Sequence, residues 1–137
     1  AMEPTIVQAM VPEGVECRIG IHRHQALGDL ITLGPGGAVA EQVANEAMQL
    51  LPLTDADADR LLDRAQLGEL VDAEGAGARP ALVDVLRRVA ALAEAVPEIV
   101  TLRLNPILVV DGAAAITDVR IAVAPHTPDS RPPVRRL

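Results

Sequence analysis

Two oxygen-bearing side chains in the last third of the sequence are spaced so that they can share a metal ion. Asn105 lies in LRLNPIL and Asp118 lies in ITDVRI, and the Asp111-Gly112 pair between them is typical of a tight hairpin turn. Across such a hairpin both side chains can face one side and converge on one point. A nucleotide-bound Mg²⁺ takes only a couple of protein oxygen ligands beside the phosphates, so the pattern predicts a magnesium site. The alternative is a turn residue ahead of a proline and a solvent-facing strand residue.

A second candidate site is the Gly-Pro-Gly-Gly segment at residues 34–37, which is too rich in glycine to form a regular element. Backbone N–H groups of such a loop can cradle a phosphate. A plain turn would use the same residues, so the glycines alone leave both interpretations open.

His22, His24 and Cys17 have simpler interpretations. The two histidines stand two positions apart on one expected strand face and could ligate a metal, but no third ligand is close in the sequence. Surface histidines on a strand are the alternative. Cys17 falls on the apolar face of the same strand, where we expect it in the core.

The elements expected to position these residues are mostly strands. Residues 14–23 alternate apolar and polar side chains, the pattern of a half-buried strand. Strands are also expected at residues 5–8, 29–33, 100–104, 107–110 and 114–123. The first pair after residue 14 and the last pair around the Asp111-Gly112 turn should each form an antiparallel hairpin.

Two helices are expected between these hairpins. Thr54 with Asp57 resembles a capping box that opens the first helix. The aspartates of this region could suggest calcium, but they lack the glycine and the terminal glutamate of a calcium loop. Residues 73–80 are expected to be a loop, and residues 81–96 carry the strongest helical periodicity. The order of elements predicts an α+β fold, with helices packed on one face of a largely antiparallel sheet.

The composition limits the classes of function. The chain has 137 residues, of which 50% are hydrophobic and none is Phe, Tyr or Trp, so an aliphatic core is expected and base stacking on aromatic rings is excluded. The net charge of -7 argues against a nucleic-acid surface. No apolar run approaches the roughly 20 residues that span a bilayer. With one cysteine and no segment resembling a signal peptide, a cytoplasmic protein is expected.

One domain is expected over residues 1–124, followed by a mobile Pro- and Arg-rich tail over residues 125–137. The strand-like run at residues 5–8 follows Ala1-Met2 almost at once. We therefore expect the chain to be a part of a longer protein.

Several segments, taken in order, resemble one protein family. The run MVPEGVECRIGIHRHQALGDLITLGPGGAVAEQ is similar to that family's Met-Val-Pro-x-Gly-Val-Glu, alternating strand, Arg-Asp, Phe-Gly and Gly-x-Gly-Gly, and LNPIL with ITDVRI resembles its metal-binding hairpin. The family is the ATP-grasp domain of ADP-forming acyl-CoA synthetases, such as acetate-CoA ligase and succinyl-CoA synthetase. The resemblance covers residues 4–124 and implies the C-terminal lobe of an ATP-grasp fold.

The resemblance also implies a site for Mg²⁺ with ATP or ADP. Asn105 and Asp118 fall on the family's two Mg²⁺ ligands. The nucleotide-binding positions that it implies are Gln8, Met10, Glu16, Gly36, Gly37 and Glu41.

Three departures from the family pattern reduce the acidic charge at this site. Arg103 stands two residues before Asn105, where the family has an acidic residue, Ala9 replaces an acidic residue at the adenine side, and His24 replaces the acid after an arginine. A cation at a Mg²⁺-ATP site opposes the metal unless its side chain points away to solvent. A loss of acidic residues of this kind is expected for a regulatory or vestigial nucleotide site.

Two functions follow from the resemblance. The first is a nucleotide-binding lobe that needs a missing N-terminal ATP-grasp lobe and CoA-ligase domains to interconvert acyl-CoA, ADP and phosphate with acid, CoA and ATP. The second is a degenerate regulatory or scaffolding domain, because RIAVAPHTPDSRPPVRRL resembles the C-termini of actinobacterial lysine acetyltransferases fused to synthetase-like regions. A homo-oligomeric assembly piece without any ligand is a third alternative, which predicts an exposed apolar patch.

Overall fold

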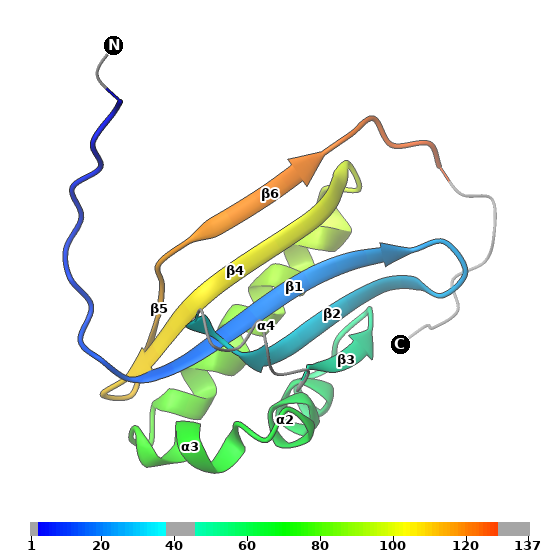
Figure 1. Cartoon of the computed structure of the whole chain (residues 1–137). Helices are drawn as coiled ribbons and strands as arrows, with labels where there is room; N and C mark the ends of the chain where they lie inside the picture. The colour runs from blue at the N-terminus through cyan, green and yellow to red at the C-terminus, as the bar shows by residue number, and fades with distance from the viewer. Residues whose placement is uncertain (1–2, 38–45, 129–137) are drawn as a thin grey trace.

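The computed structural model describes residues 3–37 and 46–128. In this part of the chain, six strands form one sheet and three helices accompany it (Figure 1). The strands are β1 (Val15–His24), β2 (Gly28–Pro35), β3 (Ala47–Leu50), β4 (Ile99–Val110), β5 (Ala113–Ile116) and β6 (Val119–Val123). The helices are α2 (Asp55–Arg64), α3 (Gly68–Ala73) and α4 (Ala78–Ala95).

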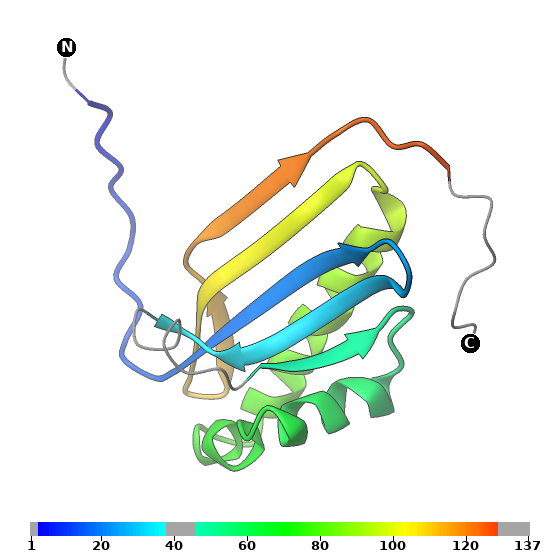
Figure 2. The same cartoon turned by 45° about the vertical axis from the view of Figure 1, so that its right-hand side comes forward.

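All strand pairs in the sheet are antiparallel, in the order β3-β2-β1-β4, with β5 and β6 both paired to the remaining edge of β4. The three helices lie on one face of the sheet and leave the other face open, as Figures 1 and 2 show. The predicted α+β fold, an antiparallel sheet with helices on one face, is confirmed. We call the uncovered side the open face.

Strand β1 shows why the sheet has two different faces. The buried side chains that β1 contributes to the core beneath the helices are Cys17, Ile19 and Ile21. Because successive strand residues point to opposite faces, Arg18 and His22 lie on the open face. The alternation seen in the sequence therefore separates the apolar core positions of β1 from Arg18 and His22.

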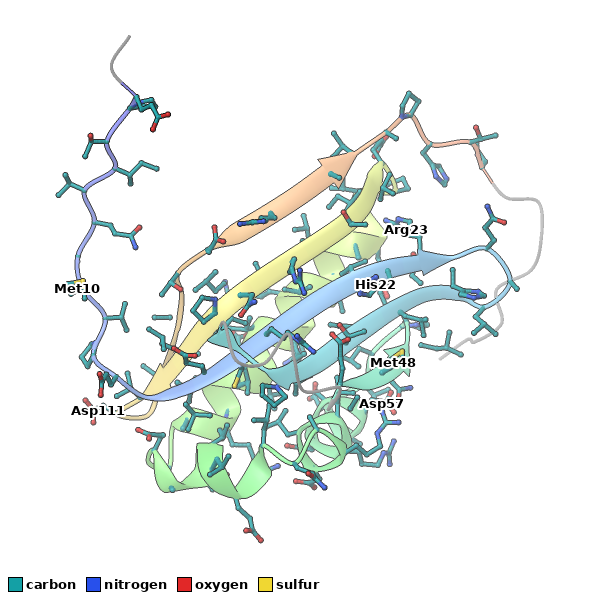
Figure 3. The ribbon with its side chains drawn as sticks, in the orientation of Figure 1. Met10, His22, Arg23, Met48, Asp57 and Asp111 are labelled. Atoms are coloured by element: carbon teal, nitrogen blue, oxygen red, sulfur yellow. The ribbon has the colours of Figure 1, made fainter. Side chains whose placement is uncertain are left out.

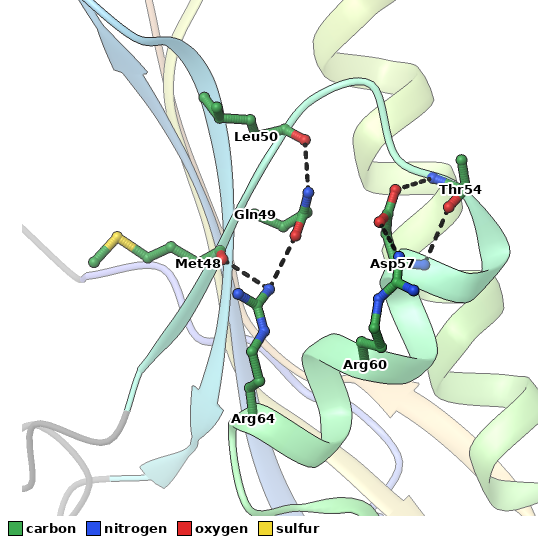
Figure 4. Close-up of polar contacts among 7 residues, drawn as sticks. All are labelled: Met48, Gln49, Leu50, Thr54, Asp57, Arg60 and Arg64. Carbon is green, nitrogen blue, oxygen red and sulfur yellow. Dashed lines mark hydrogen bonds and ion pairs between the residues drawn. The ribbon is translucent and has the colours of Figure 1, made fainter. Parts of the chain in front are cut away.

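Helix α2 begins at the predicted capping box. The Asp57 N–H donates to the Thr54 hydroxyl at 3.1 Å, and the Thr54 N–H donates to the Asp57 carboxylate at 3.0 Å (Figure 4). At the other end of α2, the Arg64 guanidinium donates to the Met48 carbonyl at 2.9 Å and to the Gln49 side-chain oxygen at 3.0 Å. The Asp57 carboxylate thus helps to cap the N-terminus of α2, and Arg64 connects the other end of α2 to β3 by hydrogen bonds.

Arg79 joins the three helices through an acidic cluster. Its guanidinium donates to both carboxylate oxygens of Asp72, at 2.8 and 2.9 Å, and to Asp63 at 3.3 Å. These bonds from Arg79 hold the pKa of Asp72 below its usual value. Helix α4 begins at Ala78, three residues earlier than predicted, and so includes the arginine that makes this connection. No helix among the described residues is long and apolar enough to cross a membrane.

The strand predicted at residues 5–8 is wrong. These residues form no strand, and Ile6 and Val7 are 85% and 91% exposed. A strand needs a neighbour for its backbone groups, and the N-terminal segment runs beside no strand of the sheet (Figure 1).

The two strands predicted around residue 105 are one continuous strand, β4, and the single strand predicted over residues 114–123 is divided into β5 and β6. Pro106 explains the division, because it has no N–H to donate to the neighbouring strand. Its carbonyl instead accepts from both the N–H and the hydroxyl of Thr117, at 3.2 and 2.8 Å. The ladder is therefore interrupted just before Asp118.

Candidate functional site

Asn105 on β4 lies opposite Asp118, in the short link between β5 and β6. The register is unchanged across this link, because Leu104 pairs with Val119 and Ile107 pairs with Ile116. The Asn105 N–H donates to the Asp118 carbonyl at 3.3 Å, and both residues line a small cavity of about 70 Å³ on the open face. The structure thus brings together the two residues that the sequence predicts to share a metal ion.

The glycine segment at the end of β2 lies against the same pair. The Gly37 N–H donates to the Asn105 Oδ1 at 2.9 Å, and the Gly36 N–H donates to the Glu16 carbonyl at 2.8 Å. Four of the predicted residues, one from β1, one from β4 and two glycines, therefore form one cluster. In this structure the Gly37 N–H thus contacts Asn105 and the Gly36 N–H attaches the segment to β1.

Two features of the structure favour glycine at position 37. The φ of 81° at Gly37 is unfavourable for any residue with a Cβ, and a Cβ there would lie 1.9 Å from the Glu16 Oε2. The Glu16 carboxylate is therefore packed directly against the glycine that holds Asn105.

Substituting Gly37 with alanine is expected to lower the melting temperature more than substituting Gly28. Both glycines have positive φ, which costs an alanine about 1–2 kcal/mol, but a Cβ at Gly28 meets no atom within 4 Å. Thermal unfolding followed by far-ultraviolet circular dichroism measures the difference. An equal loss in Gly37→Ala and Gly28→Ala would contradict the packing of Glu16 against the loop.

Two arginines flank the Asn105–Asp118 pair. Arg103 on β4 is the direct cross-strand partner of Arg120 on β6, and both line the small cavity. The Arg120 Nε lies 3.6 Å from the Asp118 carboxylate. The family resemblance draws attention to Arg103 but not to Arg120, although the position of Arg120 two residues after Asp118 places it on the same strand face.

A larger cavity of about 440 Å³ adjoins the small one on the open face. The two cavities share Arg103 and Arg120 in their walls. Arg18 and His22 of β1 line the larger cavity, and the Arg18 Nε lies 3.7 Å from the Glu46 carboxylate. Figure 3 shows His22 on β1, on the uncovered side of the sheet. The open face therefore carries two adjoining cavities, together called the hollow, and Asn105 and Asp118 line the smaller one.

Gly20 keeps the floor of the larger cavity clear. It pairs with Arg103 on one side and with Thr32 on the other, and a Cβ on it would lie 2.8 Å from the Thr32 Oγ1. The Thr32 hydroxyl is buried and has no hydrogen-bond partner within the part of the chain that the structure describes. The buried Thr32 hydroxyl thus lies beside Gly20, which has no side chain.

Two of the implied nucleotide-binding residues, Gln8 and Met10, are not part of this cluster. Gln8 and Met10 lie on the N-terminal segment, where Met10 is 93% exposed (Figure 3). Neither residue lines either of the two cavities described above. Glu41 lies outside the described residues. Their roles stay predictions.

The two histidines His22 and His24 have different surroundings in the structure. The His24 Nδ1 accepts from the N–H groups of Ala26 and Leu27, at 3.2 and 3.1 Å, and so caps the turn after β1, whereas His22 lines the larger cavity. Within residues 3–37 and 46–128, no group of three or more His, Cys, Asp or Glu side chains is placed to hold a metal ion. Burial raises the pKa of the Cys17 thiol to about 12, so this thiol stays protonated in the core.

The sequence matches a known family over nearly its whole length. The family described as ATP-grasp domain matches residues 1–123. One curated relative is the beta subunit of ADP-forming acetate–CoA ligase I of Pyrococcus furiosus, 28% identical over 85% of this chain and 51% of the subunit. Others are ADP-forming acetate–CoA ligase I of Archaeoglobus fulgidus (28% identical, 89% of this chain) and ADP-forming 4-hydroxybutyrate–CoA ligase of Nitrosopumilus maritimus (30% identical, 86% of this chain). The chain spans 18% of the length of each of these two ligases.

Solved structures agree with this match. A Pyrococcus horikoshii protein superposes with a TM-score of 0.77 at 28% identity, over 85% of this chain and 52% of that one. The dinucleotide-forming acetyl-coenzyme A synthetase 1 of Candidatus Korarchaeum cryptofilum, in complex with coenzyme A and Mg-AMPPCP, gives a TM-score of 0.75 at 25% identity, over 83% of this chain and 55% of that one.

Proposed function

The chain belongs to the ATP-grasp domain family, and on that basis we propose that it is the Mg-ATP- or Mg-ADP-binding lobe of a protein related to ADP-forming acyl-CoA synthetases. The observation that supports this proposal most directly is the convergence of Asn105, Asp118 and Gly37 at one end of the hollow on the open face. The phosphates of the nucleotide would lie at this end, with the remainder of the nucleotide over the larger cavity.

Asn105 and Asp118 suit a Mg²⁺ ion that is shared with phosphates. An amide oxygen and a carboxylate are hard oxygen ligands, and Mg²⁺ in nucleotide sites takes only one or two protein ligands. The Asn105 Oδ1 accepts one hydrogen bond from Gly37 and retains a second lone pair. When bound, the ion would neutralise phosphate oxygens and hold them in a fixed orientation.

The glycine segment acts on the site through position rather than through charge. The Gly36 bond to the Glu16 carbonyl fixes the segment to β1, and the Gly37 bond fixes the Asn105 amide. In this proposal the Asn105 oxygen faces the metal before the nucleotide arrives, so its ordering costs no binding energy at that moment.

A single lobe is expected to be insufficient for turnover. We propose that an N-terminal ATP-grasp lobe and CoA-ligase domains supply the remainder of the nucleotide site and the acyl-CoA chemistry. The lengths of the relatives support this, since the chain spans about half of the Pyrococcus furiosus beta subunit and a smaller part of the single-chain ligases.

The second candidate is a degenerate lobe that regulates or scaffolds a protein lysine acetyltransferase. The observation that favours it is the Arg103–Arg120 pair beside Asp118, because two guanidinium groups repel a divalent cation. This candidate predicts that the parent protein contains an acetyltransferase domain and that nucleotide does not bind at Asn105.

The experiment that tests the first candidate is a titration of the ¹⁵N-labelled chain with ADP in the presence of Mg²⁺, followed by NMR. We expect shifts of the amides around residues 16–20, 103–105 and 118–120. Asn105→Ala and Asp118→Ala should each weaken binding by about tenfold or more, because each removes a charge-assisted contact.

Asp84→Ala is the matched control, because Asp84 is exposed on α4 and paired only with Arg88 among the described contacts. It should bind as the wild type does. Binding that is unchanged in both Asn105→Ala and Asp118→Ala, or no binding by the wild type, would overturn the proposed function and favour the degenerate lobe.

A further inference from the structure

The Thr32 side chain contains a hydroxyl group that is buried without a hydrogen bond. Thr32 lies on β2 and is 1% exposed, and its Oγ1 has no hydrogen-bond partner within the residues that the structure describes. A buried hydroxyl in this state destabilises a fold, and an apolar side chain of the same shape would not. Stability alone therefore favours valine at this position, so the hydroxyl requires a functional explanation.

The hydroxyl of Thr32 lies beside the floor of the larger cavity. Thr32 and Gly20 are direct cross-strand partners, so they share the open face of the sheet. Gly20 lines the larger cavity, and a Cβ on it would lie 2.8 Å from the Thr32 Oγ1. The hydroxyl therefore borders the space over the Gly20 Cα that a larger residue would fill.

Two further polar groups border the same space. The His22 Nε2 lies 3.3 Å and the Leu102 carbonyl oxygen 3.6 Å from the position of a Cβ on Gly20. A hydroxyl can donate and accept, a neutral imidazole offers one donor and one acceptor, and a carbonyl only accepts. A ligand hydroxyl group can satisfy all three partners, whereas a phosphate oxygen could not donate to the carbonyl.

The His22 side chain can make room for such a ligand. It is exposed and extends over Gly20, and exposed side chains change rotamer within picoseconds to nanoseconds. Rotation of the imidazole would open the Thr32 hydroxyl to the larger cavity without any movement of the backbone.

On the basis of the proposed function, we infer that Thr32 and His22 bind a ribose hydroxyl group of the nucleotide over Gly20. The larger cavity adjoins the small cavity, where the phosphates would lie, and the ribose is the part of a nucleotide that is joined directly to the phosphates. The ribose is also the part that carries hydroxyl groups. Thr32 thus distinguishes a ribonucleotide from its deoxy analogue, at a cost in stability of the ligand-free fold.

The experiment compares three ligands, each titrated with Mg²⁺ into the whole ¹⁵N-labelled chain and followed by NMR. The ligands are ADP, 2′,3′-dideoxy-ADP and inorganic pyrophosphate, which reports on the phosphate end alone. For the wild type we expect ADP to bind about three- to tenfold more tightly than its dideoxy analogue, the effect of one neutral hydrogen-bonded group.

Thr32→Val is the decisive variant because it removes the hydroxyl and keeps the shape of the side chain. It should weaken ADP binding by about three- to tenfold and leave the binding of dideoxy-ADP and pyrophosphate unchanged. Its melting temperature should equal or exceed that of the wild type. His22→Ala should likewise weaken ADP binding but not pyrophosphate binding. Thr5→Val, the same change on the exposed N-terminal segment, is the matched control and should alter none of these values.

The results separate this inference from the proposed function. Equal binding of ADP and dideoxy-ADP by the wild type, or unchanged ADP binding by Thr32→Val, overturns the ribose contact and leaves the phosphate end in place. A melting temperature of Thr32→Val well below that of the wild type assigns the hydroxyl a structural role and also overturns the inference. If the wild type binds neither ADP nor pyrophosphate, the proposed nucleotide site is wrong, and the ribose contact with it.

Discussion

Substitution of Leu86 by alanine is expected to lower the free energy of unfolding by about 2–5 kcal/mol. Leu86 lies on the face of α4 that packs on the sheet, and it is fully buried in the core. The sequence contains no aromatic residue, so the core is filled by aliphatic side chains. No aromatic ring is therefore present that could shift into the cavity left by the Leu86 side chain. Urea denaturation followed by circular dichroism measures the change.

Leu92 provides the control on the same helix. It is 39% exposed, so Leu92→Ala removes the same atoms with a smaller loss of buried area. We expect Leu92→Ala to lower the free energy of unfolding much less than Leu86→Ala does. Comparable losses would show that α4 does not pack on the sheet through the face assigned to it.

Substitution of Arg23 by methionine is expected to lower the free energy of unfolding by about 2–4 kcal/mol, the second large effect. The Arg23 guanidinium donates to the carbonyls of Ala93 and Val96 at the end of α4, at 2.9 and 3.2 Å, to the Ile99 carbonyl and to the Asp29 carboxylate. Figure 3 shows Arg23 where β1 passes the end of that helix. A methionine fills similar space but leaves these acceptors without their donor.

Arg88→Met is the control, because the Arg88 side chain is 80% exposed and its ion pair with Asp84 lies within α4. Exposed pairs of this kind contribute little, so its urea midpoint should be near that of the wild type. If Arg23→Met unfolds at the same urea concentration as Arg88→Met, the proposed tie between β1, β2 and the end of α4 is wrong.

The parts of the fold that the sequence could predict are those encoded in local patterns. The alternation of β1 identified its buried face, and Thr54 with Asp57 marked the start of α2. Asp111 and Gly112 both have positive φ in the structure, as a two-residue hairpin turn between β4 and β5 requires. That turn fixes the register, which is why Asn105 and Asp118 could be placed together in advance.

The remaining features depend on contacts between distant residues. The strand-like run at residues 5–8 predicts a strand, but none of the described strands pairs with it. Strand β3 has only four residues and α3 only six, too few for a period to be recognised. The contact of Glu16 with Gly37 depends on the positive φ of Gly37 at the end of β2, so it becomes visible only in three dimensions.

The pairing of β1 with β4 has a consequence for how the protein folds. This central ladder joins residues near opposite ends of the described chain, with all three helices and two other strands between them. Loop closure over such a separation is slow, because its entropy cost is offset only when the contacts of the ladder have formed. Helices α2 to α4 and the β1–β2 hairpin can form from neighbouring residues, whereas Gly37 can donate to Asn105 only after β4 has joined β1. The proposed nucleotide site should therefore form late in folding, and it should be lost in any partly folded state that opens the β1–β4 ladder, even where the helices persist.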